Sequence, residues 1–174
     1  MPIIFNNFLN ISIMKIKFRI LLLSFSLFLG VAEAQVNVVA NLGNAGSIPA
    51  TWIKLGTLSL AQGGNTAVIR ISVGAGYNAI LNQMSSLEIN LKTSNNSSIV
   101  NGFAFSAYAY QTGYTKAINS IKIVPNANGV SATAYDIYIY SVAYAGYGVY
   151  EVAASTGSWT RSETITTDPG ASAY

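Results

Sequence analysis

The chain has 174 residues, of which 51% are hydrophobic and only 9% are charged, and it contains no cysteine and no histidine. Lack of these two residue types excludes Ser-His-Asp and Cys-His nucleophiles, thiolate chemistry and a conventional zinc site, so we expect neither a cofactor nor a metal. Three of the nine Lys and Arg residues behind the formal net charge of +3 lie together at Lys15, Lys17 and Arg19. The six bases after Gln35 are scattered, which excludes the clustered basic face that nucleic-acid binding needs.

The first predicted element is a cleaved signal peptide over residues 1–34. A positively charged n-region precedes the apolar run Ile20–Val31. Ala32-Glu33-Ala34 then supplies the small-x-small pattern that signal peptidase accepts, which predicts cleavage before Gln35. We therefore expect the working protein to comprise residues 35–174 and to be secreted, extracellular or held at the cell surface.

Two alternatives concern this N-terminal segment. Met14 is a candidate for the true start, because the residues before it carry no charge. A retained membrane anchor is the other alternative, but an anchor needs about 18 or more apolar residues. The run here is shorter and ends in a cleavage pattern, and the chain lacks the cysteine of bacterial lipoproteins. We therefore expect no stable membrane insertion.

Strand periodicity recurs after Gln35, whereas no segment there has a convincing helical period. Ser86–Lys92 is the clearest case, since its apolar residues alternate with Glu88, Asn90 and Lys92. Similar short runs, rich in β-branched and aromatic residues, predict nine strands. They are Val36–Ala40, Trp52–Leu60, Ala67–Val73, Ser86–Lys92, Phe103–Tyr110, Ser120–Val124, Ala132–Tyr140, Val149–Ala154 and Thr160–Thr166.

The segments between these strands are rich in glycine and asparagine, which favour chain reversals. Gln62-Gly63-Gly64-Asn65, Asn126-Ala127-Asn128-Gly129 and Gly146-Tyr147-Gly148 are predicted turns. Many short strands with frequent turns predict an all-β fold, a single β-sandwich or jelly-roll-like domain. Strands within Phe103–Val152 are apolar on both faces, which indicates a buried sheet or one covered by a neighbouring subunit.

Carboxylates are the only residues left that could carry catalysis, and the predicted domain has five. A glycosidase needs two of them on either side of the scissile bond. Asp136 is the most notable, because Tyr135-Asp136-Ile137-Tyr138 embeds it in an apolar strand. Its simpler interpretation is a solvent-facing or lysine-paired strand residue. We predict that the protein is not an enzyme.

Tyrosines are the strongest candidates for ligand binding. Flat aromatic rings stack on the apolar faces of sugars and also serve as rigid anchors at protein interfaces. Those in predicted turns, with a polar neighbour, are the candidate ligand-binding residues: Tyr77, Asn78, Tyr114, Tyr144 and Tyr147.

A second group of tyrosines falls within predicted strands. For these the simpler interpretation is that they pack the sheet or a subunit interface. The members are Tyr108, Tyr110, Tyr135, Tyr138 and Tyr140.

From Trp52 onward the sequence resembles the C-terminal head domains of bacteriophage tail fibres. The matching segments are Trp52–Leu58, Gln62–Gly64, Thr66–Ile71, Gly74–Asn78, Glu88–Thr93 and Tyr135–Tyr138. The resemblance implies a β-sandwich, usually trimeric, that contacts receptors on a bacterial surface. The predicted signal peptide departs from that pattern and indicates a secreted, stand-alone bacterial relative.

These observations predict a secreted, adhesin-like binding module without catalytic activity. Its partner would be a cell-surface glycan or protein ligand, and self-association as a homotrimer is expected. Two alternatives remain: a structural subunit of an extracellular fibre or sheath, and a small outer-membrane β-barrel. The barrel is disfavoured because the predicted strands are shorter than the nine to eleven residues, roughly, that spanning strands need.

Overall fold

Nine strands form two antiparallel sheets in the computed structural model, which describes residues 36–43, 49–75 and 82–170. Sheet A has the order β1 (Val36–Gly43), β8 (Ala145–Ala154), β3 (Thr66–Ala75), β4 (Met84–Thr93) and β5 (Phe105–Gly113). Sheet B has the order β6 (Ile118–Pro125), β7 (Ala134–Ser141), β2 (Thr51–Ser59) and β9 (Ser158–Thr166). The predicted signal peptide, residues 1–34, lies outside the described residues.

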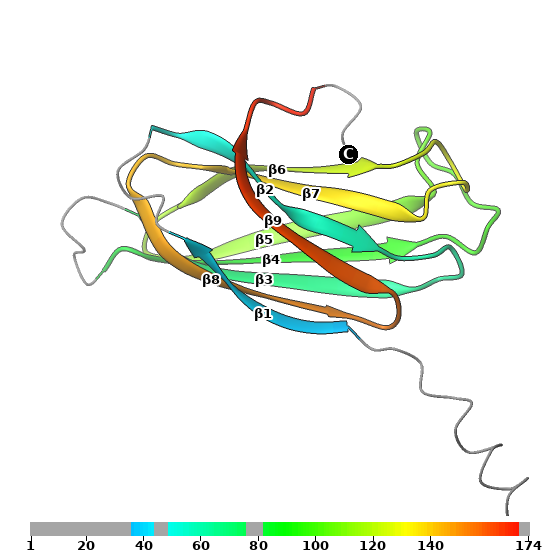
Figure 1. The fold of residues 1–174 in the computed structure, drawn as a ribbon, viewed down its shortest axis with the longest axis horizontal. Coiled ribbons are helices and arrows are strands. Elements are labelled where there is room, and N and C mark those ends of the chain that lie inside the picture. Colours follow the sequence, from blue (N-terminus) through cyan, green and yellow to red (C-terminus); the bar gives the residue numbers. More distant parts are fainter. Residues whose placement is uncertain (1–35, 44–48, 76–81, 171–174) are drawn as a thin grey trace, which may run out of the picture. The chain divides into compact units, whose positions relative to one another are not determined.

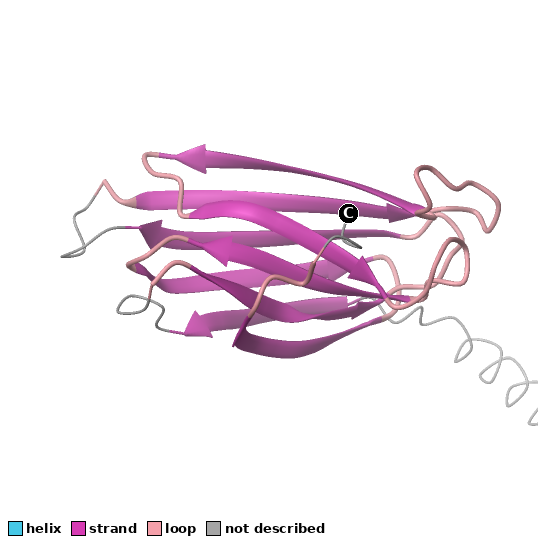
Figure 2. Cartoon of the chain, turned by 90° about the horizontal axis from the view of Figure 1, so that it is seen from above, coloured by secondary structure: helices cyan, strands magenta, loops and turns pink. Residues whose placement is uncertain are grey.

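The two sheets pack face to face as a β-sandwich (Figures 1 and 2). The described residues contain strands and connecting loops and no helix, so the predicted all-β fold is confirmed. Within them, no helix meets the length and apolarity needed to cross a membrane. Pairing of β1 with β8 and of β2 with β7 joins early to late strands, as expected of a jelly-roll-like sandwich.

Each predicted strand corresponds to one of the nine in the structure, with ends that differ by a few residues. The predicted turn at Gly146-Tyr147-Gly148 is wrong, because these residues lie inside β8. The reversal comes earlier, where Tyr144 adopts a φ of 59°. Gly148 serves close packing instead: a Cβ there would lie 2.6 Å from the Leu42 side chain and 3.1 Å from that of Val73.

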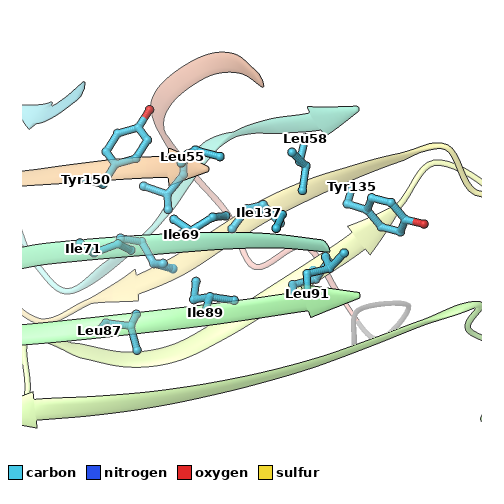
Figure 3. Packing of buried hydrophobic residues seen from close by; sticks show 14 of the residues in the cluster. Leu55, Leu58, Ile69, Ile71, Leu87, Ile89, Leu91, Tyr135, Ile137 and Tyr150 are labelled. Atoms are coloured by element: carbon cyan, nitrogen blue, oxygen red, sulfur yellow. The ribbon is translucent and has the colours of Figure 1, made fainter. Parts of the chain in front are cut away.

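The core lies between the inner faces of the two sheets. Alternate residues of β4 and β7 are buried, as strand geometry requires of a half-covered sheet. Figure 3 shows part of this core, with side chains from both sheets pointing toward one another. The largest side chains with less than 2% exposure are Tyr135, Tyr150, Leu55, Leu58, Leu60, Ile71, Ile89, Ile123, Ile137, Ile139 and Val152. With no disulfide available, this apolar burial is the main stabilising term.

A bulge in β2 shifts its register against both neighbouring strands between Lys54 and Gly56. Leu55 is fully buried. The buried residues of β2 are odd-numbered up to Leu55 and even-numbered after it, at Gly56 and Leu58. Gly56 is required here, because a Cβ would lie 2.4 Å from the Thr160 carbonyl oxygen and 2.5 Å from the Trp159 ring. The bulge therefore lets the edge strand β9 place its Trp159 ring against Gly56 of β2.

Candidate ligand-binding face

The outer face of sheet A carries two exposed tyrosines side by side on β5. Alternate strand residues share a face, so Tyr108 and Tyr110 both point away from the core. Their exposed fractions are 66% and 52%. Directly opposite them on β4 lie Asn90 and Glu88, respectively.

Arg70 on β3 organises the polar half of this surface. Its Nε donates to Glu88 Oε2 at 2.8 Å, and its Nη1 donates to Glu151 Oε1 on β8 at 2.9 Å. The amide of Asn90 donates to the other Glu88 oxygen, also at 2.9 Å. We call the surface formed by Tyr108, Tyr110, Asn90, Glu88 and Arg70 the tyrosine face.

The protonation states of the tyrosine face follow from these contacts. Hydrogen bonds from Asn90 and then from Arg70 lower the pKa of Glu88. Hydrogen bonding to Glu88 raises the pKa of the Tyr110 phenol, and the bonds to Glu88 and Glu151 raise the pKa of Arg70. All three shifts favour an ionised carboxylate, a protonated phenol and a guanidinium on this surface at neutral pH.

A groove of about 520 Å³ adjoins the tyrosine face at the β4–β5 loop. Part of its wall is formed by Lys92 of β4 and Ser106 of β5. These two residues lie opposite each other on the outer face of sheet A, next to the pair Asn90 and Tyr108. Phe103 and Phe105 also line it, with ring centroids 5.5 Å apart in an edge-to-face arrangement. The face thus continues into a recess with aromatic, hydroxyl and cationic groups.

The outer face of sheet B also carries aromatic side chains, but these pack against one another and against lysines of the same face. The Trp52 and Tyr140 rings lie 5.3 Å apart, and Lys122 Nζ sits 5.0 Å from the Trp52 ring centroid. Lys54 Nζ lies 2.7 Å from Asp136. This ion pair confirms the simpler interpretation of that acid as a lysine-paired strand residue.

The five sequence-predicted site residues do not form one described cluster. Tyr77 and Asn78 lie outside the described residues. Tyr147 is in β8, and its side chain is not described. Tyr114 is 81% exposed just after β5, and its N–H donates to the Met84 carbonyl at 2.9 Å. Tyr144, 47% exposed, lies in the β7–β8 turn.

Tyr114 and Tyr144 nevertheless lie at the same end of sheet A. Gly74 on β3 pairs both with Met84 and with Gly146, which brings the start of β4 and the start of β8 to one edge of the sheet. Tyr114 follows β5 and Tyr144 precedes β8, and β3 and β4 lie between these two strands in the sheet order. The described residues therefore place both tyrosines at the end of the sandwich, away from the Arg70 network.

The sequence interpretation missed the two tyrosines of the tyrosine face. Among the strand tyrosines, Tyr135 is fully buried, and Tyr138 and Tyr140 are half-buried, but Tyr108 and Tyr110 do not pack against the sheet within this chain. A signal for them exists: Phe105–Gln111 alternates small or apolar residues with serine and tyrosine. That alternation assigns both rings to the same side of the strand.

No group of three or more acidic side chains that could hold a metal ion is found in the described part of the chain. All five described carboxylates, from Glu88 to Asp168, instead contact a lysine or arginine. The pairs are Lys54–Asp136, Arg70–Glu88, Arg70–Glu151, Lys122–Asp168 and Arg161–Glu163.

The sequence is similar to part of the long tail fibre protein Gp37 of Enterobacteria phage T2, with 29% identity over 117 residues. The match covers 67% of this chain and 8% of the fibre protein, so the chain spans less than a tenth of that relative's length. The similarity supports a relationship to phage tail fibres and does not single out a C-terminal head domain. No family model matches the chain.

Among solved structures, the fold resembles part of WceF from Pantoea stewartii, a glycan biofilm modifying enzyme with a bacteriophage tailspike-like parallel β-helix fold. The TM-score is 0.61 with 11% identity, over 78% of this chain and 21% of WceF. At this identity the likeness shows a shared fold alone. The Acinetobacter phage vB_ApiP_P1 tailspike protein gives a TM-score of 0.38 and 17% identity, over 76% of this chain and 23% of the tailspike; this match carries no argument.

Proposed function

We propose that the protein is a secreted, non-catalytic recognition module related to phage tail fibres, and that its tyrosine face binds a cell-surface glycan. The observation that carries the proposal is the exposure of Tyr108 and Tyr110 beside an ordered row of polar groups. Sugar rings present apolar C–H faces that stack on such aromatic rings. Asn90 lies opposite Tyr108, and Arg70 lies in the same row as Tyr110 with Glu88 between them, so both place N–H donors for sugar hydroxyls on this face.

The state of the carboxylates supports binding without chemistry. A glycosidase needs one carboxyl group with a raised pKa to act as the acid. Glu88 has the opposite shift, and Arg70 joins it to Glu151. The similarity to a tail fibre protein also favours recognition over turnover.

The test compares a double variant of the tyrosine face with a control variant on a glycan array and then by titration calorimetry. We expect Tyr108→Ala with Tyr110→Ala to abolish array binding, because truncating one aromatic anchor costs about 1–2 kcal/mol, or roughly 5- to 30-fold in Kd. The control, Tyr144→Ala, removes an exposed tyrosine outside the face and should bind as the wild type does. Loss of binding in the control alone would contradict the assignment.

A structural subunit of an extracellular fibre or sheath is the second candidate. The uncharged outer strand β5 favours it, because such strands pair readily with another chain. Assemblies of a fibre subunit would grow with protein concentration, whereas a recognition module would keep a discrete mass. Light scattering over a dilution series distinguishes the two.

A further inference from the structure

The edge strands of the two sheets differ in how they are protected against pairing with another chain. Natural sheets block their edges with charged residues, proline and bulges. β6 has Lys122, Pro125 and a register shift at its start. β9 has Arg161, and Glu163 sits at a register shift with a φ of 48°.

The edges of sheet A are β1 and β5. β1 is uncharged, but its pairing with β8 shifts between Asn41 and Gly43, and it contacts β9 of the other sheet. β5 has nine residues, no charge and no proline, and its pairing with β4 runs without a register shift. Among the described edge strands, β5 is therefore the one with no charge, proline or register shift. Phe105 and Ala107 at its start already have interaction partners, which leaves residues 109–113 for pairing.

The hydrogen-bond pattern shows which groups β5 directs outward. The N–H of Tyr114 donates to the Met84 carbonyl, and at the other end of the pairing the N–H of Ser94 donates to the Ala104 carbonyl. Because bonded pairs alternate in an antiparallel ladder, the even-numbered residues of β5 bond to β4. The backbone groups of Ala109, Gln111 and Gly113 consequently point away from β4. Ala109 and Gly113 are both exposed.

We propose that two copies of this chain pair antiparallel along β5, with Gln111 of each copy on the two-fold axis. In this register Ala109 of one copy bonds with Gly113 of the other, so the outward groups of the strands match. The outer-face pairs between copies are Tyr108 with Tyr114 and Tyr110 with Thr112. Aromatic–aromatic and aromatic–β-branched cross-strand pairs are among the favourable ones.

This pairing joins the two tyrosine faces into one continuous surface, on which the second copy contributes its Tyr114 next to Tyr108. A two-site surface gains avidity for a repeating ligand such as a polysaccharide. That consequence rests on the proposed glycan-binding function, whereas the pairing itself does not. A two-fold contact closes as a dimer, in place of the trimer that the tail-fibre resemblance implies.

The test begins with the mass of the purified full chain, measured by size exclusion with light scattering. We expect the mass of two chains for the wild type and of one chain for Ala109→Lys, because a charged residue on an edge strand is a device by which natural sheets block pairing. Val149→Lys is the matched control, since it adds the same charge on the outer face of β8, where the side chain is 47% exposed. It should remain dimeric. A wild-type mass of one or three chains overturns the proposal.

A second measurement tests the register and does not depend on the folding of the lysine variant. The chain has no cysteine, so Tyr110→Cys combined with Thr112→Cys introduces the only thiols. These positions face each other between copies in a non-hydrogen-bonded pair, whose Cα spacing of about 4.5 Å suits a disulfide. We expect a cross-linked dimer on oxidation, and none from Thr112→Cys alone. No cross-link from the double variant overturns the register. Because neither measurement uses a glycan, a failed dimer leaves the proposed function standing, and failed glycan binding leaves the dimer standing.

Discussion

Arg70 of β3 lies directly opposite Glu88 of β4 in the strand ladder and donates to its carboxylate over 2.8 Å. The same rung continues on both sides, to Glu151 on β8 and to Tyr110 on β5. Four strands of sheet A therefore contribute one residue each to a single polar row. In this row two carboxylates bind one guanidinium, and the row ends at the exposed phenol of Tyr110. These contacts link the polar side chains of the tyrosine face to one another.

The pKa of Glu88 tests this row directly. Because Asn90 and Arg70 donate to the carboxylate, its NMR titration midpoint should lie below the ordinary value of 4.5. Asn90→Ala removes the hydrogen bond that lowers the pKa of Glu88 most and should raise the midpoint, while the remote Tyr144→Ala leaves it unchanged. A depressed folded pKa means that this group stabilises the fold above pH 4.5 and loses that effect as the pH falls through its folded value. A wild-type midpoint at or above 4.5 would show that the row does not persist in solution.

Gly56→Ala tests the bulge in β2. The new methyl group would meet the Thr160 carbonyl oxygen and the Trp159 ring at less than 3 Å. Since a backbone oxygen cannot rotate away, we expect the free energy of unfolding to fall by about 1–3 kcal/mol, as overpacking does. Chemical denaturation measures this, with Ser59→Ala in the same strand as the control. An unchanged midpoint in denaturant would contradict the packing of β9 against the bulge.

Tyr150→Phe tests the link between the sheets. The Tyr150 hydroxyl hydrogen-bonds to Glu163 of β9 and accepts from Trp159 Nε1 at 3.3 Å. Burial, followed by the bond to Glu163, raises the pKa of Tyr150 from 10.0 to about 12.

A group whose pKa is raised in the folded state stabilises the fold by its full amount when the pH is below its pKa in the unfolded state. This contribution is lost as the pH rises through its pKa in the folded state. The wild type should therefore be more stable than Tyr150→Phe below pH 10, and its advantage should shrink between pH 10 and 12. Denaturant titrations of both proteins across this range give the difference. An advantage that grows with pH would refute the assigned bond.

Local pattern alone predicted much of the fold. Ser86–Lys92 alternates cleanly, and β4 buries Leu87, Ile89 and Leu91 as that alternation requires. The Gly146-Tyr147-Gly148 error shows the limit. Glycine there accommodates Leu42 and Val73 from neighbouring strands, and a contact between residues so distant in sequence leaves no local signal.

The tyrosine face was missed for a related reason. Tyr110 and Tyr138 both alternate with apolar residues in aromatic strands, so their sequence contexts look alike. β7 lies between β6 and β2, and Tyr138 is half-buried among its neighbours, whereas β5 is an edge and Tyr110 stays exposed. The exposure of a strand tyrosine depends on where its strand falls in the sheet order, which a single sequence does not determine.

The assignment of the tyrosine face as the binding surface can be tested most directly by amide chemical-shift mapping. The protein would be titrated with the strongest glycan from the array. We predict that the shift changes concentrate on β4 and β5, centred on Asn90, Tyr108 and Tyr110. Changes confined to the β7–β8 turn around Tyr144 would contradict the assignment.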